Sequence, residues 1–174
     1  KIFTQVRAAL AWQAMPQPKD KPLAWKLAAF QSSFEVYLGQ AADAVPILES
    51  CAAYFAPRNL WFESAESNFF AGEGARLNGD FDKARRCLHA ATGFYQKIGQ
   101  RNGEALCLNV LGLTALAEKD FPTALRLLEE SLQIFIDSGL LFGQMLVNIN
   151  LGSLLKGLGD LPGAQKRLEA SLPI

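Results

Sequence analysis

The sequence predicts an all-α chain built as a solenoid of tandem helical hairpins. An internal repeat is the first observation: the phrase "GDFDKARRCLHAA" at 79–91 has near copies at 119–131 and 159–171, an offset of 40 residues. The second is that apolar residues follow helical spacing twice within each period, as in 104–119 and 121–136. A fixed period of this size is typical of solenoids, in which each unit buries its apolar face against its neighbours.

Small and large residues recur at fixed positions of the repeat. The recurring positions hold glycine at 72, 112 and 152, alanine at 44, 84, 124 and 164, leucine at 48, 88, 128 and 168, and an aromatic residue at 55, 95 and 135. We expect the glycines and alanines to let the two helices of a hairpin approach closely, with the leucine filling the space beside that contact.

The first elements precede the regular repeats. At the same offset, Thr4, Ala8, Ala11 and Met15 fall on Ala44, Leu48, Cys51 and Phe55, so residues 1–15 are expected to form the second helix of a preceding unit. Three prolines stiffen the connection at 15–22. The first full unit is then 22–59, which follows the pattern mainly in its second helix.

Three further units follow at 60–99, 100–139 and 140–174, the last one truncated. Asp80, Asp120 and Asp160 precede the second helices and are expected to cap their free amide groups. Pro122 and Pro162 lie in the first helical turn, where a missing amide hydrogen costs little. We expect loops at 97–103 and 137–143, where glycines at 99 and 139 suit the left-handed residue that ends a helix.

Both ends of the chain interrupt a repeat. Solenoids carry polar capping units, so we expect a piece of a longer array, or ends that another element covers. Uncapped ends also predict end-to-end self-association. The chain begins at Lys1 without an initiator methionine, which fits a longer parent protein.

Composition excludes several classes of function. The 17 basic and 17 acidic residues balance, so the broad positive field that nucleic acid or an anionic membrane requires is absent. No apolar run is long enough to span a bilayer, and the start of the chain lacks the apolar core of a signal peptide. Three cysteines without metal-ligand spacing indicate free thiols in a reducing compartment, and we expect a cytoplasmic protein.

Motifs for catalysis are missing from the sequence. "GEGARLNG" at 72–79 departs from the phosphate-binding glycine pattern, and His89 has no nucleophile and carboxylate to complete a catalytic set. We therefore predict a chain that is not an enzyme and that has no cofactor and no metal site. Cys51, Cys87 and Cys107 are interpreted as packing residues.

The repeated residues resemble the tetratricopeptide-repeat family. Leu108, Leu111-Gly112, Ala115, Ala124, Leu128 and Ser131 match its pattern of large and small residues, and 148–171 repeats the match. The resemblance implies a right-handed superhelix over the whole chain. The 40-residue period is longer than the common 34 and is similar to repeats in bacterial signal-transduction ATPases and transcriptional regulators, and in some animal polarity adaptors.

In that family the first helices line the concave groove. By resemblance, the partner-binding residues of the groove are Glu66, Phe69, Glu73, Arg76, Leu106, Asn109, Leu113, Leu116, Leu146, Ile149, Asn150 and Ser153. The family's basic and asparagine clamp for a terminal carboxylate is absent from these positions. Two alternatives stay open: Leu113 and Leu116 face a partner or are buried, and Asn109 and Asn150 bind a peptide backbone or tie helices together.

These observations predict a non-catalytic scaffold that binds a protein partner. A peptide or an amphipathic helix in the concave groove suits its apolar middle. The alternative is a ligand-sensing or regulatory domain of a larger bacterial signalling protein or transcriptional regulator.

Overall fold

The structure is a computed structural model that describes residues 22–171. Within this range the chain forms helices and no strand, as the sequence predicts. In chain order the elements are α2 (Pro22–Tyr37), α3 (Ala41–Phe55), the 3-10 helix η1 (Ala56–Arg58), α4 (Trp61–Leu77), α5 (Phe81–Lys97), α6 (Arg101–Ala117), α7 (Phe121–Asp137), α8 (Leu141–Gly157) and α9 (Leu161–Glu169). The helix expected at 1–15 lies outside the described residues.

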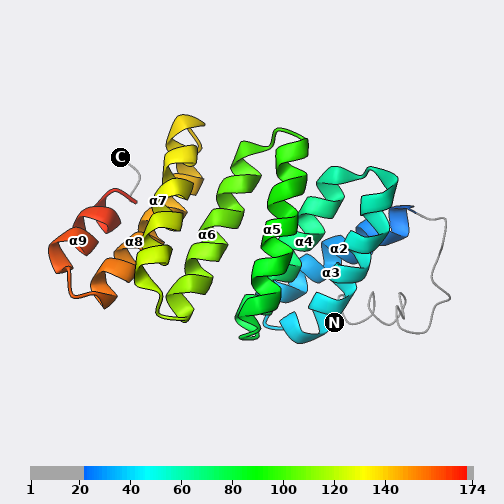
Figure 1. Cartoon of the computed structure of the whole chain (residues 1–174), viewed down its shortest axis with the longest axis horizontal. Coiled ribbons are helices and arrows are strands. Elements are labelled where there is room, and N and C mark those ends of the chain that lie inside the picture. Colours follow the sequence, from blue (N-terminus) through cyan, green and yellow to red (C-terminus); the bar gives the residue numbers. More distant parts are fainter. Residues whose placement is uncertain (1–21, 172–174) are drawn as a thin grey trace.

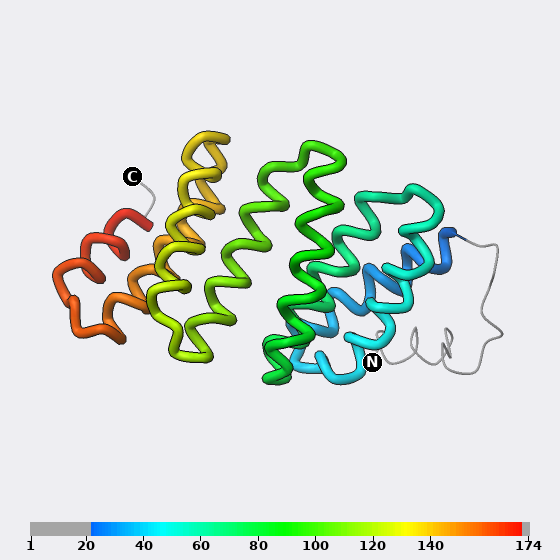
Figure 2. Tube along the Cα trace, in the orientation of Figure 1, coloured from blue at the N-terminus to red at the C-terminus, as the bar shows by residue number. Residues whose placement is uncertain are grey.

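The helices stand side by side in chain order as an elongated row (Figure 1). Each helix packs mainly on the helix before it and the helix after it. Consecutive helices run in opposite directions, so α2/α3, α4/α5, α6/α7 and α8/α9 are four hairpins (Figure 2). The all-α solenoid predicted from the repeat is confirmed.

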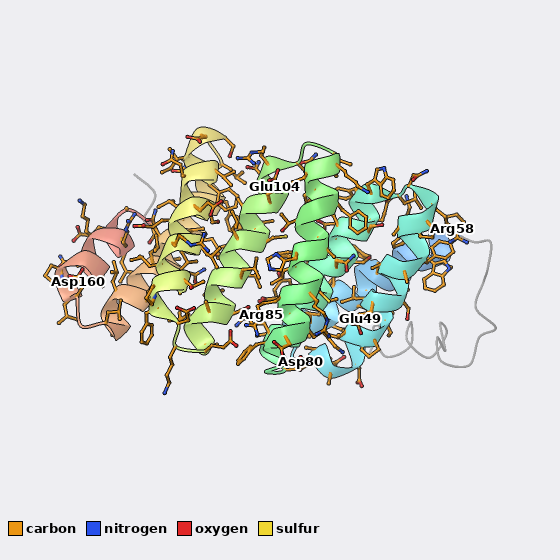
Figure 3. All side chains as sticks on the ribbon, in the orientation of Figure 1. Glu49, Arg58, Asp80, Arg85, Glu104 and Asp160 are labelled. Atoms are coloured by element: carbon orange, nitrogen blue, oxygen red, sulfur yellow. The ribbon has the colours of Figure 1, made fainter. Side chains whose placement is uncertain are left out.

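Aspartate caps begin three of the second helices. The Asp80 carboxylate accepts a hydrogen bond from the backbone amide of Lys83 at 3.0 Å. In the same way, Asp120 accepts a hydrogen bond from the Thr123 amide at 3.2 Å, and Asp160 accepts one from the Gly163 amide at 2.9 Å. Figure 3 shows the first of these aspartates at the start of α5. Each cap satisfies an amide that has no partner within its own helix, and the predicted caps are confirmed.

In three of the four hairpins, a glycine of the first helix packs against a leucine of the second helix. A Cβ atom at Gly72 would lie 2.7 Å from Leu88 Cγ, and a Cβ atom at Gly112 would lie 2.9 Å from Leu128 Cγ. The carbonyl oxygen of the recurring alanine lies close to the same point. Any larger residue at the glycine would push the helices apart, which confirms the packing inferred from the repeat.

A second set of glycines joins neighbouring hairpins. Gly103 and Gly143 lie against the rings of Tyr95 and Phe135, where an added Cβ would come within 2.4 Å. The loops expected at 97–103 and 137–143 are shorter than predicted, because α5 ends at Lys97, α6 begins at Arg101, α7 ends at Asp137 and α8 begins at Leu141. The left-handed conformation expected at Gly99 and Gly139 is confirmed, with φ of 68° and 69°. Gly103 and Gly143 each lie within a helix, and the helix has glycine at this position because the ring fills the space that a side chain would take.

The first helices of the hairpins form one face of the row, called here the first-helix face. Direct contacts join α2 to α4, α4 to α6 and α6 to α8, whereas no comparable contact joins α3 to α5 or α5 to α7 in the described range. Because the first helices lie closer together than the second helices, the row bends toward the first-helix face. This face is the side on which the sequence predicts the groove.

A candidate binding pocket on the first-helix face

A pocket of about 290 Å³ opens between α2 and α4. Its lining residues are Lys26, Ala29, Phe30, Ser33, Leu48, Phe55, Phe62, Glu63, Glu66, Ser67 and Phe70. The volume is near the lower end of the range typical of small ligand sites. It is large enough for one amino-acid side chain.

The pocket exists because one position of the repeat is small in α2. Ala29 stands where α4 has Phe69 and α6 has Asn109. In the later helices these larger side chains are buried, at 6% and 3% exposure. The short alanine side chain leaves the corresponding space between α2 and α4 open.

Phenylalanine rings supply most of the walls. Phe30 and Phe62 are largely exposed at 64% and 53%, whereas Phe55 belongs to the buried core. The Phe70 ring lies edge-on to the ring of Tyr37, with centroids 5.9 Å apart. The rings therefore enclose the pocket on several sides while two of them remain open to a partner.

An ion pair between α2 and α4 borders the pocket. The Lys26 ammonium contacts the Glu63 carboxylate, and both residues line the opening. Burial opposes ionisation of Glu63, but hydrogen bonds from Lys26 and from a backbone amide outweigh it and lower the pKa of the carboxyl group. The charge of Glu63 is thus compensated within the protein.

Glu66 is the carboxylate in the pocket without a cation beside it. It accepts a hydrogen bond from the Tyr95 hydroxyl, and no lysine or arginine pairs with it among the described residues. Burial raises the pKa of Tyr95, and the negative charge of Glu66 raises it further. The Tyr95 hydroxyl therefore stays protonated and holds the Glu66 side chain in place as a donor.

Two serines add polar atoms to the lining. Ser33 donates its hydroxyl to the Phe30 carbonyl at 2.7 Å. Ser67 is only 1% exposed, and its Oγ has no hydrogen-bond partner in the protein. A buried hydroxyl without a partner is costly, and Ser67 is one of the residues that line the pocket.

The other groove residues predicted on α4 lie apart from the pocket. Phe69 packs into the core, and the buried Glu73 accepts two hydrogen bonds from the guanidinium of Arg76, at 2.8 and 2.9 Å. These hydrogen bonds raise the pKa of Arg76. Only Glu66 of the four predicted α4 residues lines the pocket.

The predicted residues of α6 divide between core and surface. Leu106 packs against two neighbouring core clusters, and Leu116 packs against one of them, so both are half-buried. Leu113 is half-buried as well. Asn109 accepts a hydrogen bond from Asn150 of α8 at 2.8 Å. Of the two uses considered for these asparagines, the structure contains the tie between helices.

The predicted residues of α8 are more open. Ile149 is 41% exposed, Ser153 is exposed and donates its hydroxyl to the carbonyl of Ile149, and Leu146 is half-buried. Together with Leu113, the isoleucine supplies accessible apolar surface further along the first-helix face. The pocket and these residues lie on the same face but between different pairs of helices.

Sequence reasoning missed the α2 side of the site. Lys26, Phe30 and Ser33 come from α2, and Phe62 and Phe70 from α4. An offset of 40 places Lys26 at the position of Glu66 and Ser33 at the position of Glu73, so the repeat contained a signal for both. The phenylalanines had no such signal, because their exposure depends on how α2 and α4 lie relative to each other.

The described residues were also compared with what a metal site, a membrane span or a reactive thiol requires. The described range contains no group of three or more metal-ligating side chains, and none of its helices is long and apolar enough to cross a membrane. The three cysteines are free and buried. Burial raises the pKa of Cys51 and Cys107 to about 12, which keeps these thiols protonated and unreactive near neutral pH.

Comparison with known families agrees with this architecture. Residues 63–137, which include α5, α6 and α7, match the family model described as "Tetratricopeptide repeat". The chain is a tetratricopeptide-repeat-like solenoid. Such repeats generally mediate protein–protein interaction and are typically non-catalytic scaffolds. A search of curated proteins finds no match to the chain.

Solved structures show the same fold at low sequence identity. BtubC (BKLC) from P. vanneervenii superimposes with a TM-score of 0.76 at 18% identity, covering 98% of this chain and 72% of that chain. A structure from Podosopora anserina, described by "kinesin light chain nearly identical TPR-like repeats", gives 0.68 at 18% identity, covering 87% and 75%. Its Q17M form gives 0.70 at 18% identity, covering 98% and 82%. These similarities establish the fold of the solenoid.

Proposed function

We propose that the chain is a non-catalytic interaction module that binds a peptide or an amphipathic helix of a protein partner on its first-helix face. The observation that carries the proposal is the open pocket between α2 and α4, with exposed Phe30 and Phe62 at its walls. Exposed apolar surface around a concave site is typical of a contact surface.

Further accessible side chains extend this surface along the row. Leu113 and Ile149 add apolar area on α6 and α8. An amphipathic helix binds a groove through apolar residues spaced by three and four positions, which suits separate apolar points along one face. The partner segment would therefore lie across several first helices.

A selection experiment tests the proposal. A displayed library of 16-residue peptides is selected on the immobilised wild-type chain, and binding of the selected peptides is measured by fluorescence anisotropy. We expect the double variant Leu113→Asp, Ile149→Asp to bind these peptides at least about tenfold more weakly, because each aspartate places a charge in an apolar contact. Leu106 is unsuitable for this test because it packs into the core.

The control adds one negative charge on the side of the row formed by the second helices. Gln133→Asp alters an exposed residue of α7, a second helix, and should leave binding unchanged. Circular dichroism and unfolding midpoints show whether each variant is folded. Selected peptides that bind the folded double variant as tightly as wild type would refute a contact surface that extends over α6 and α8.

A further inference from the structure

We propose that the pocket between α2 and α4 binds the guanidinium group of an arginine side chain. This inference rests on the proposed function, because it names the residue of the partner segment that would enter the pocket. The argument depends on three properties of the site: an uncompensated carboxylate, aromatic walls and a buried hydroxyl without a partner.

Two carboxylates of α2 and α4, Glu66 and Glu35, have no cation beside them among the described residues, and only Glu66 lines the pocket. Lys26 neutralises Glu63, and Arg76 neutralises Glu73. Glu66 receives only the neutral Tyr95 hydroxyl. A carboxylate in a partly enclosed apolar site is stabilised by a bound cation, so the pocket favours a positively charged group.

The aromatic walls select among cations. Phe30, Phe55, Phe62 and Phe70 surround the space beside Glu66. A guanidinium group is planar, stacks on aromatic faces and sheds water more readily than an ammonium group does. A neutral aromatic side chain in the same space would displace water from Glu66 without supplying a counter-charge. Arginine is thus favoured over lysine and over tryptophan.

The unpartnered hydroxyl supplies the second polar contact. Ser67 lines the pocket, and its buried Oγ has no partner among the described residues. Arginine carries five N–H donors in a fixed fork, so one group can donate to Glu66 and to Ser67 together. An ammonium group has three donors on a single atom and spans less distance between acceptors.

The direct test uses a small probe and the whole chain. The ¹⁵N-labelled protein is titrated with Nα-acetyl-arginine amide and, separately, with Nα-acetyl-citrulline amide, which has nearly the same shape but no charge. We expect the arginine probe to shift amide signals of α2 and α4 and to bind at least about tenfold more tightly than the citrulline probe. Equal binding of the two probes would overturn the inference.

Three variants assign the effect to the pocket. Glu66→Gln keeps an acceptor for Tyr95 but removes the charge, and should weaken arginine binding at least about tenfold. Ser67→Ala should weaken it by a smaller factor. Ala29→Phe introduces the residue that α4 has at this position, and should fill the pocket and abolish binding. If folded Glu66→Gln and Ala29→Phe proteins bind the arginine probe as wild type does, the site is elsewhere.

A control and the peptide selection separate this inference from the proposed function. Glu130→Gln removes an exposed carboxylate of α7 and should leave probe binding unchanged. Selected peptides that bind the first-helix face without any preference for arginine would refute the pocket assignment and leave the interaction module standing. Arginine binding in the pocket, with no peptide that senses Leu113 or Ile149, would support the pocket and refute the wider groove.

Discussion

Helices α2 and α6 occupy the same place in the repeat but differ in what they expose. Four positions of α2 hold large apolar residues that are 47% exposed or more, whereas the four positions 80 residues later in α6 hold small or medium residues that are buried. The α2 residues are Leu23, Leu27, Phe30 and Phe34, and the α6 residues are Gly103, Cys107, Val110 and Thr114.

The difference comes from the neighbours of each helix. Helix α6 packs between α5 and α7, and the Tyr95 ring of α5 covers its start. In the described part of the chain, α2 packs on α3 and α4 and has no second helix before it. Burial in a solenoid therefore depends on the adjoining unit as much as on the residue itself.

The largest expected effect compares one leucine position in two settings. Leu128 is fully buried against Gly112, whereas Leu168 packs on Gly152 but is 42% exposed. We expect Leu128→Ala to lower the free energy of unfolding by about 2–5 kcal/mol through loss of burial and a cavity. Leu168→Ala should cost about 1 kcal/mol. Urea denaturation followed by circular dichroism measures both, and equal losses would contradict the dependence on neighbours.

The second-largest expected change in stability concerns the contact between hairpins, where Gly103 packs on the Tyr95 ring. Gly103→Ala would place a Cβ atom against the Tyr95 ring, and we expect a loss of about 1–3 kcal/mol from overpacking. Gly93→Ala is the matched control on α5, because a Cβ there meets no atom within 4 Å. It should stabilise the chain by up to about 1 kcal/mol through better helix propensity. The same urea titration shows whether the free energy of unfolding falls in Gly103→Ala and rises in Gly93→Ala.

The next prediction concerns the hydrogen bond between Asn109 and Asn150, whose two positions are compared with the corresponding positions 80 residues earlier. Asn109 and Asn150 bond α6 to α8, whereas the counterparts between α2 and α4 are Ala29 and Phe70 in the pocket. Asn150→Ala leaves the buried Asn109 oxygen without its donor, and we expect a loss of about 1–3 kcal/mol. Ser153→Ala, on the exposed side of α8, should stay within about 0.5 kcal/mol of wild type. Thermal and urea midpoints that do not change in Asn150→Ala would show that the bond contributes nothing.

The smallest effect concerns the caps, which are local and should not depend on neighbours. Hydrogen bonds from the Thr123 side chain and backbone amide lower the pKa of Asp120 below its unfolded value. The stabilisation is present above the unfolded pKa and is lost as the pH falls through the folded pKa, below about pH 4. Asp120→Asn keeps a cap without the titration, so its urea midpoint should fall less than that of wild type between pH 5 and pH 3. Parallel curves would exclude this contribution.

The repeat alone predicted the hairpins, the caps and the glycine–leucine contacts. Each depends on residues close in sequence or on a position repeated every 40 residues, as with Gly112 and Leu128. The start of α6 was misjudged because Gly103 has the composition of a loop residue, and only the Tyr95 ring explains its place in a helix.

The candidate site was less predictable. Glu66 was found by resemblance, but the pocket depends on the short side chain of Ala29 and on the exposure of Phe30 and Phe62. Those properties arise between two helices that are not adjacent in sequence, where the spacing of apolar residues contains no information. The burial of Asn109 has the same origin, since its partner is 41 residues away.

The glycine and ring contacts at Gly103 and Gly143 also affect how the molecule responds to force. Each hairpin touches mainly the hairpins beside it, so a pull on the two ends is carried in series through these contacts. The resistance of the row to stretching therefore depends on these contacts between hairpins as well as on the helices themselves.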